Sequence, residues 1–379
     1  MPHLADDQTT CCGCAACAAV CPVNAVSMQS DGVFDYPVVD ETRCVGCGKC
    51  ERVCAFKQVK PDGRRPPAAF AATHTDDVRL ESSSGGIFTA LTDHFLRQGG
   101  AVYGAAYDHA MRVTHSRADD EAGRNRMRGS KYVQSDMGGA YGALRRDLDT
   151  GRPVLFSGTP CEVAAVKAFF GHDAQRIFLV DIICHGVPSP AFWQDFIRLL
   201  EAGYKKKVRD YRFRNKEIAW RRYSPLVTLA DGTTVPENDL TGSFIEVFRY
   251  ELTLRPSCAA CPYASLSRQG DLTIGDFWGV EKRRPALDDD KGVSAVLVNT
   301  ETGRAVLDAL RNDVTLTEVT ADDIAAGQVN LSRPSVRSPE ADTFIRIWKE
   351  KGAEAALKKY TRVGAKRRLK DAAKAILRR

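Results

Sequence analysis

The chain has 379 residues, of which 44% are hydrophobic and 27% are charged, so it can bury a sizeable core and we expect two or three domains. Its 13 cysteines are grouped at metal-ligand spacing in a large chain, which favours a reducing compartment and argues against a small disulfide-stapled secreted protein. The net charge of +6 comes without an aromatic-interleaved basic face or a binding motif, so we expect no nucleic-acid partner.

The start of the sequence and its apolar runs bear on where the protein works. No charged-then-apolar leader opens the chain, and the best apolar run, residues 177–184, is short and contains Asp181. We therefore expect a cytoplasmic protein in which this run forms a buried strand.

A cysteine pattern occurs twice in the first 54 residues. Cys11, Cys14, Cys17 and Cys21 are followed at the same spacing by Cys44, Cys47, Cys50 and Cys54. This spacing is the ligand pattern of two [4Fe–4S] clusters of the bacterial ferredoxin type, in which the fourth cysteine of each run serves the other cluster. We therefore assign Cys11, Cys14, Cys17 and Cys54 to one cluster, and Cys44, Cys47, Cys50 and Cys21 to the second.

Two residues depart from the pattern, and one alternative metal must be weighed. Ala55 stands where a proline is usual, as Pro22 does after the first run, which weakens the turn and not the ligation. Cys12 is surplus, and we expect it to be a packed thiol. Zinc also binds C-x-x-C pairs, but a zinc site leaves the two fourth cysteines without a role, so the spacing favours clusters.

The order of elements along the chain predicts its architecture. Residues 1–60 form a ferredoxin-like domain with an insertion at about 27–42, and the proline-rich residues 61–69 form a linker. Strand patterns then follow at 101–107, 153–157, 177–183, 208–214, 226–229, 272–274 and 293–299. Helical patterns cover 86–98, 159–170, 189–201 and parts of 341–360.

This alternation predicts the fold class α+β / α/β. We expect a small two-cluster ferredoxin-like domain, then a larger α/β domain with a parallel or mixed sheet over 70–340, and a helical basic C-terminal region over 341–379. From Lys349 to the end the chain has 12 Lys and Arg against three Asp and Glu. Such a tail is either a solvated, frayed helix or a peripheral contact to an anionic membrane face or an acidic partner.

Three glycine- and serine-rich turns lie where a strand or coil is expected to enter a helix of the large domain. Small residues let backbone N–H groups approach an anion, and a helix N-terminus adds partial positive charge. Each turn alone is also compatible with plain loop geometry, but the three together favour a binding site for the pyrophosphate of a dinucleotide or a flavin. None matches G-x-G-x-x-G or a P-loop, which disfavours a standard NAD site. The candidate cofactor-binding residues are Ser83, Ser84, Gly85, Gly86, Ser130, Lys131, Tyr132, Ser157, Gly158 and Thr159.

The remaining cysteines come from separate segments of the large domain: Cys161, Cys184, Cys258 and Cys261. Four thiolates from such segments can complete a third [4Fe–4S] site. A zinc site and buried structural cysteines remain the alternatives, and we favour the cluster.

Five ordered motifs resemble the coenzyme F-420 hydrogenase/dehydrogenase beta-subunit family. They are the segments 82–88, 129–132, 157–161, 184–190 and 270–279. The resemblance covers about residues 70–340 and includes the ferredoxin module that many members carry in front. It implies an FAD-binding domain with its own [4Fe–4S] cluster that passes electrons between ferredoxin-type clusters and the flavin.

From this resemblance we expect an iron–sulfur flavin-dependent oxidoreductase. It would take single electrons from ferredoxin or a redox partner subunit and exchange a hydride with coenzyme F-420 or another small organic substrate. Lys131 is the candidate for stabilising the reduced flavin or an FAD phosphate, and His185 is the candidate for proton transfer. Asp276 and Trp278 are expected to shape the pocket. The alternatives are a non-enzymatic electron-transfer subunit and a redox accessory of surface-polysaccharide biosynthesis.

Overall fold

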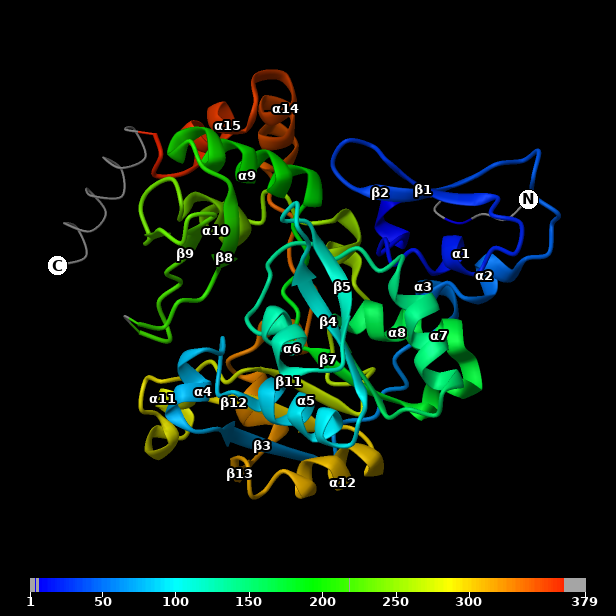
Figure 1. Ribbon diagram of the computed structural model, residues 1–379, viewed down its shortest axis with the longest axis vertical. Coiled ribbons are helices and arrows are strands. Elements are labelled where there is room, and N and C mark those ends of the chain that lie inside the picture. Colours follow the sequence, from blue (N-terminus) through cyan, green and yellow to red (C-terminus); the bar gives the residue numbers. More distant parts are fainter. Residues whose placement is uncertain (1–3, 5–6, 218, 365–379) are drawn as a thin grey trace.

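A computed structural model describes residue 4 and residues 7–217 and 219–364. The cysteine-rich N-terminal residues form a small module beside a larger α/β domain, and this agrees with the predicted fold class (Figure 1). Most of the basic tail predicted for the C-terminal end, including Lys366 and Lys370, lies outside the described residues. Among the described residues, no helix combines the length and the apolar character needed to cross a bilayer.

The N-terminal module consists of short helices around a β-hairpin. The hairpin pairs β1 (Val26–Ser30) with β2 (Asp35–Val39) antiparallel, and the Asp31 carboxylate closes its turn by accepting from the backbone N–H of Val33 at 2.7 Å. The segment that the sequence indicated only as an insertion is therefore this hairpin. The helical elements are η1 (Gln8–Thr10), α1 (Ala16–Ala19), α2 (Lys49–Arg52) and α3 (Ala55–Gln58).

The larger domain is built on an eight-stranded sheet in the order β13-β3-β12-β11-β7-β6-β4-β5. The inner strands β4, β6, β7 and β11 run parallel, and the flanking strands add antiparallel pairs. The sheet is thus mixed, as predicted. Its strands are β3 (Ala68–Thr73), β4 (Ala101–Tyr107), β5 (Val113–Ala118), β6 (Val154–Gly158), β7 (Ile177–Ile182), β11 (Leu272–Asp276), β12 (Ser294–Val298) and β13 (Thr315–Val319).

Helices cover both faces of this sheet because its central strands are apolar on both sides. Helices α5 (Ile87–Arg97) and α12 (Glu301–Ala309) pack on one face with the core that includes Leu155 and Val180. On the other face, α7 (Ala140–Asp149) and α8 (Pro160–Phe170) bury Phe156 and Leu179. The remaining short elements of the domain are α4 (Asp76–Leu80), α6 (Glu121–Met127), η2 (Gly171–Arg176), η3 (Pro256–Ala260), α11 (Val280–Arg283), η4 (Pro285–Leu287), α13 (Ala321–Ala325) and η5 (Val329–Leu331).

A second core lies beside the main sheet. It joins α9 (Pro190–Tyr204) and α10 (Ser243–Arg249) to a small antiparallel sheet of β8 (Val208–Arg212), β9 (Leu226–Leu229) and β10 (Thr234–Val235). Helices α14 (Ala341–Lys351) and α15 (Ala353–Tyr360) pack into the same core, next to α9 (Figure 1). The C-terminal helices, expected as a separate region, are thus integral to the larger domain up to Tyr360.

The N-terminal module rests on the larger domain through α7 and α8. Ala16 of α1 and Val53 are buried in the same core as the helices that cover that sheet face. Helix α3 ends at Gln58 and strand β3 begins at Ala68, so the segment that connects the module to the sheet is 59–67, two residues earlier than the 61–69 linker expected from composition. This contact places the cysteine-rich module against the N-terminal end of α8.

Candidate functional site

The eight cysteines of the repeated pattern line two separate hollows in the N-terminal module. One hollow is lined by Cys11, Cys14, Cys17 and Cys54, and the other by Cys21, Cys44, Cys47 and Cys50. The fourth cysteine of each run therefore lies with the three cysteines of the other run. Backbone N–H groups point at two of the sulfurs, from Ala25 to Cys21 Sγ at 3.1 Å and from Gly13 to Cys11 Sγ at 3.4 Å. Such donors favour the thiolate form that iron–sulfur ligands require.

The four remaining cysteines lie close enough together in the larger domain for their thiols to affect one another's pKa. Cys161 lies in the first turn of α8, Cys184 follows β7, and Cys258 and Cys261 lie in and after η3. Burial, reinforced by repulsion from neighbouring cysteines, raises the pKa of the Cys258 and Cys261 thiols to about 12. Thiols held this close ionise together only when a cationic centre offsets their charge, so the set fits a metal cluster. Within the described residues, no three His, Cys, Asp or Glu side chains converge on a single-ion site.

A buried ion pair holds this cysteine set together. Arg268 Nη2 lies 2.8 Å from Asp181 Oδ1, and the two side chains are 1% and 0% exposed. Asp181 also accepts from the backbone N–H groups of Gln269 and Gly270, and Arg268 donates to the carbonyl of Tyr263 at 3.1 Å. The pair therefore ties the loop after Cys261 to β7, the strand that leads into Cys184.

The set in the larger domain adjoins the nearer set of the module. Cys14 of the module and Cys161 and Cys261 of the larger domain pack against the same small core of Ala55, Ala164, Ala165 and Tyr263. The neighbouring Cys14 and Cys161 also raise the pKa of the surplus Cys12 thiol well above its usual value. The Tyr263 hydroxyl lies 3.0 Å from the carbonyl oxygens of both Ala55 and Val59, at the end of the module. The three cysteine sets thus follow one another from the module into the larger domain.

A cavity of about 530 Å³ opens at the carboxyl ends of the parallel strands. This edge of an open α/β sheet is where ligands usually bind, and the volume falls within the range of small-molecule and cofactor sites. Cys184 lines the cavity, so the third cysteine set forms part of its wall. The structure also brings the three predicted turns together here. The predicted residues that line it are Ser83, Ser84, Gly86, Ser130, Lys131, Tyr132, Ser157, Gly158 and Thr159.

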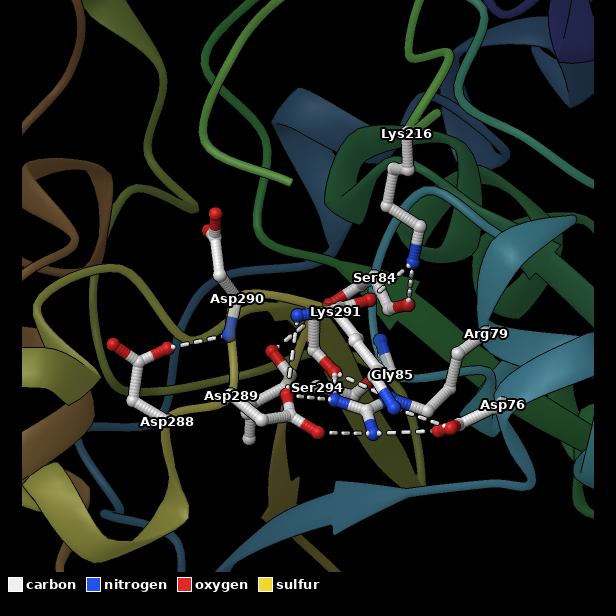
Figure 2. Close-up of polar contacts among 12 residues, drawn as sticks. Asp76, Arg79, Ser84, Gly85, Lys216, Asp288, Asp289, Asp290, Lys291 and Ser294 are labelled. Atoms are coloured by element: carbon white, nitrogen blue, oxygen red, sulfur yellow. Dashed lines mark hydrogen bonds and ion pairs between the residues drawn. The ribbon is translucent and has the colours of Figure 1, made fainter. Parts of the chain in front are cut away.

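The first turn, residues 82–86, is fixed from behind by a polar network (Figure 2). Lys216 Nζ donates to the Ser84 carbonyl at 2.7 Å, and the Gly85 N–H donates to Ser294 Oγ at 2.9 Å. Gly85 therefore packs behind the turn and does not line the cavity. A Cβ atom at position 85 would clash with the carbonyl oxygen of Ala72, at 2.2 Å. The turn leads into α5, which has Gly86 in the left-handed region and no side-chain cap. An uncapped helix N-terminus facing a cavity suits an anion.

The second turn is joined to the first and holds Lys131. The Ser130 N–H donates to Ser83 Oγ at 2.7 Å. Lys131 Nζ donates to the backbone carbonyls of Arg126, Arg128 and Gly129 at 2.8, 2.9 and 3.1 Å, and burial lowers its pKa to about 7. Its protons are engaged by the chain itself, which gives Lys131 a local structural role; its expected part in flavin stabilisation stays a prediction.

The third turn ends in a helix that is already capped. Thr159 and Glu162 form a capping box at the start of α8, and the Thr159 N–H donates to Glu162 Oε2 at 2.7 Å. Beside it lies His115, whose Nδ1 is 2.7 Å from Ser135 Oγ and whose Nε2 is 3.1 Å from the Ser157 carbonyl. Sequence reasoning missed His115, because a single histidine in a strand carries no spacing signal.

His185 lies on the cavity wall with a partner at each ring nitrogen. Nε2 is 3.1 Å from Glu251 Oε1 and Nδ1 is 3.3 Å from Asn330 Oδ1, and the side chain is 37% exposed. Glu251 has φ +56°, a strained conformation for a residue other than glycine. Each ring nitrogen of His185 therefore faces a side-chain oxygen, while the ring lines the cavity. Glu251 and Asn330 were not predicted, since neither belongs to a motif.

Aromatic side chains form another wall of the cavity. Tyr132 stacks on Phe248 with ring centroids 4.6 Å apart, and Trp278 stacks on Trp220 at 5.0 Å. Asp276, expected to shape the pocket, is held by Arg214 at 3.0 Å and by the Trp220 indole N–H at 2.8 Å. Both carboxylate oxygens are thus engaged, which leaves Asp276 a structural part in placing the ring of Trp278. The uncapped α5, the joined serines and this aromatic wall fit a flavin dinucleotide.

Two family models match this chain. The model that describes the C terminus of the coenzyme F-420 hydrogenase/dehydrogenase beta subunit matches residues 151–324, and a 4Fe-4S dicluster domain matches residues 10–58. Among solved structures, a chain of the F-420-reducing [NiFe] hydrogenase complex from Methanosarcina barkeri is similar, with 17% identity, a TM-score of 0.46, and coverage of 78% of this chain and 91% of that one. No curated protein matches.

Proposed function

We propose a function that starts from two family matches. Residues 151–324 match the coenzyme F-420 hydrogenase/dehydrogenase beta-subunit family, and residues 10–58 match a 4Fe-4S dicluster domain. The protein is an oxidoreductase that moves single electrons through three [4Fe–4S] sites to FAD in the 530 Å³ cavity. It exchanges a hydride with a small organic substrate at the open side of that cavity.

The observation that carries this proposal is the continuity of the sites. Cys14 and Cys161 pack against one small core, and Cys184 belongs to the third cysteine set while it lines the cavity. Single-electron carriers exchange charge with a flavin only when they lie close to it, and this order of sites provides such a route.

The protein's own residues would bind and orient the reactants. Bound FAD supplies the conversion between single electrons and a hydride, and the clusters supply single-electron transfer. Ser83, Ser130 and the N-terminus of α5 would hold the pyrophosphate. Tyr132, Phe248 and Trp278 line the cavity, where they would exclude water and provide flat surfaces for a ring system. His185, oriented by Glu251, would donate or accept a proton at Nε2 or Nδ1.

Anaerobic purification with iron, sulfide and flavin analysis tests the proposal. We expect about twelve irons and one FAD per chain, as three four-iron clusters require. About eight irons without flavin would reduce the protein to a ferredoxin module fused to a domain of another function. A chain with all cofactors that reduces no organic acceptor from dithionite-reduced ferredoxin would instead be an electron-transfer subunit.

A charge variant tests the location of the flavin. Ser130→Asp puts a carboxylate beside Ser83 in the cavity and should repel the pyrophosphate, so we expect FAD content to fall at least tenfold. Ser130→Asn, of nearly the same size and uncharged, is the matched control and should retain most of the FAD. Iron content should stay constant in both, because the cysteine sets are made from other residues.

A further inference from the structure

Arg255 is a buried arginine at the junction of two cysteine sets. It is 1% exposed, and its carbonyl accepts from the Cys258 N–H at 2.9 Å, so its backbone belongs to the segment that carries the third set. Its side chain reaches the N-terminal module, where Nε donates to the Cys11 carbonyl at 2.8 Å and Nη2 lies 3.7 Å from Cys11 Sγ. Arg255 therefore joins the ligand segments of two predicted clusters, one through its backbone and the other through its side chain.

The rest of the guanidinium is engaged by neutral groups. Nη1 donates to Gln134 Oε1 and Nη2 to the Asp35 carbonyl, each at 2.9 Å. The rings of Phe34 and Tyr36 lie 5.1 and 4.4 Å from the guanidinium carbon. Burial raises the pKa of the Tyr36 hydroxyl to about 12, so this neighbour stays neutral near pH 7.

Arg255 differs in this respect from the other deeply buried arginines of the described chain. Each of those pairs with an aspartate: Arg79 with Asp289, Arg124 with Asp93, Arg214 with Asp276 and Arg268 with Asp181. Among the described residues, no carboxylate forms an ion pair with Arg255. A buried charge without a counter-charge is costly, so an anion beside the guanidinium would stabilise this arrangement.

The local backbone is shaped to admit this side chain. Gly13, one residue before Cys14, has φ +70°, and a Cβ at this position would lie 2.5 Å from Arg255 Nη1. The guanidinium thus occupies the space that any other residue at position 13 would fill. Cys11, with its sulfur beside Nη2, supplies the missing anion once it is a thiolate bound to a cluster.

We propose that Arg255 is the counter-charge of the cluster held by Cys11, Cys14, Cys17 and Cys54, and that it raises the reduction potential of this cluster. Reduction by one electron from the neighbouring cluster would make the net charge of a cluster bound here one unit more negative, and the fixed guanidinium charge would stabilise that reduced state. Arg255 itself neither gains nor loses a proton. This role rests on the proposed function, because it needs the cluster assignments made there.

Redox titration of the anaerobically purified full chain, followed by electron paramagnetic resonance, tests the proposal. In Arg255→Gln we expect the ratio of reduced to oxidised cluster at a fixed potential to fall at least tenfold, about 59 mV for one electron. The cluster held by Cys21, Cys44, Cys47 and Cys50 serves as the internal reference, and its signal, assigned with Cys47→Ser, should not shift.

Two further variants separate charge from packing. Arg255→Lys keeps the charge, so its potential should lie closer to the wild type than that of Arg255→Gln. Gln134→Glu places a carboxylate against Nη1 without removing the guanidinium, so it should lower the same potential even if Arg255→Gln does not retain its clusters. Because Arg255 is buried, the shift should change little between low and high salt.

The outcomes distinguish this role from the proposed function. If Arg255→Gln and Gln134→Glu retain their iron and show the wild-type potentials, Arg255 is only a packing residue and the proposal is overturned. A wild-type chain that carries no iron–sulfur signal after chemical reduction would instead overturn the proposed function, and with it the basis of this inference.

Discussion

The N-terminal module and the larger domain assemble their cysteines in opposite ways. In the module, each set takes three cysteines from a stretch of seven residues and one from the other run. In the larger domain, four cysteines come from α8, the end of β7 and the η3 segment, which span residues 161 to 261. The first arrangement is fixed by local chain geometry, and the second exists only when the sheet, its helices and the Arg268–Asp181 pair are in place. The contrast predicts that loss of a cysteine in the module affects only its own cluster site. Loss of a cysteine or of the ion pair in the larger domain should also affect other parts of the protein.

The largest expected effect comes from removing a ligand of the third set. In Cys184→Ser we expect iron to fall from about twelve to about eight atoms per chain, as loss of one four-iron cluster requires. Electron transfer from the module to the flavin should stop, because Cys184 stands between them at the cavity wall. Iron analysis and stopped-flow flavin reduction measure both effects.

The matched variant in the module is Cys47→Ser. Cys47 is exposed, whereas the third set lies inside the larger domain, so we expect loss of the outer cluster with the flavin and the third cluster retained. Equal disruption of the whole chain by the two variants would contradict the contrast between the two regions.

The next effect in size concerns the ion pair that assembles the third set. Arg268→Met leaves Asp181 charged and unpaired at 0% exposure, which should lower the free energy of unfolding by about 3–5 kcal/mol. Urea denaturation of the anaerobic protein measures this loss, and the third cluster should be lost first. Arg337→Met is the control, because the exposed pair of Arg337 with Asp342 should contribute only about 0–1 kcal/mol.

A smaller effect is expected at the contact between the two regions. Tyr263→Phe leaves the carbonyls of Ala55 and Val59 without the hydroxyl, which should cost about 1–3 kcal/mol. Limited proteolysis should then cut faster in the segment before β3, while both hollows of the module keep their iron. Tyr204→Phe, which removes an exposed hydroxyl bonded to Asn238, should leave the proteolysis rate unchanged.

The smallest effect is a pH dependence in the network behind the first turn. Burial lowers the pKa of Lys216 to about 7 from its usual 10.5. Between these values the unfolded chain binds a proton that the folded chain has released, so the free energy of unfolding rises with pH. Between pH 7 and 9, the free energy of unfolding of the wild type should therefore rise by about 1–2 kcal/mol more than that of Lys216→Met. Urea denaturation midpoints at both pH values measure this difference. If the midpoints of the wild type and of Lys216→Met change equally with pH, Lys216 has no such role.

The features carried by short-range pattern were predictable. Strands β4 and β9 have the predicted bounds, and the serine and glycine turns line the cavity, except for Gly85. The family resemblance, predicted over about residues 70–340, is confirmed over residues 151–324, which hold three of the five motifs. These features depend on residue spacing and periodicity, which the sequence displays directly.

The features that depend on long-range contacts were not predictable in the same way. Strand β3 is mostly alanine, which lacks the branched side chains typical of strands, and it is stabilised by its neighbours β12 and β13. His115, Glu251 and Arg255 belong to no motif, and each acquires its partners only when distant segments meet. The absence of a carboxylate beside Arg255 among the described residues becomes visible only in three dimensions.

Because Cys47 is exposed, the electron donor and the organic reactant would meet the protein at different ends of the route. The neighbouring Val45 is 66% exposed, so the outer end of the module presents an open surface on which an electron donor can dock. The organic reactant would be selected at the other end of the route, by the histidine and the aromatic rings. If the proposed function holds, substitutions around residue 45 would change which donor binds and leave the specificity for the organic reactant unchanged.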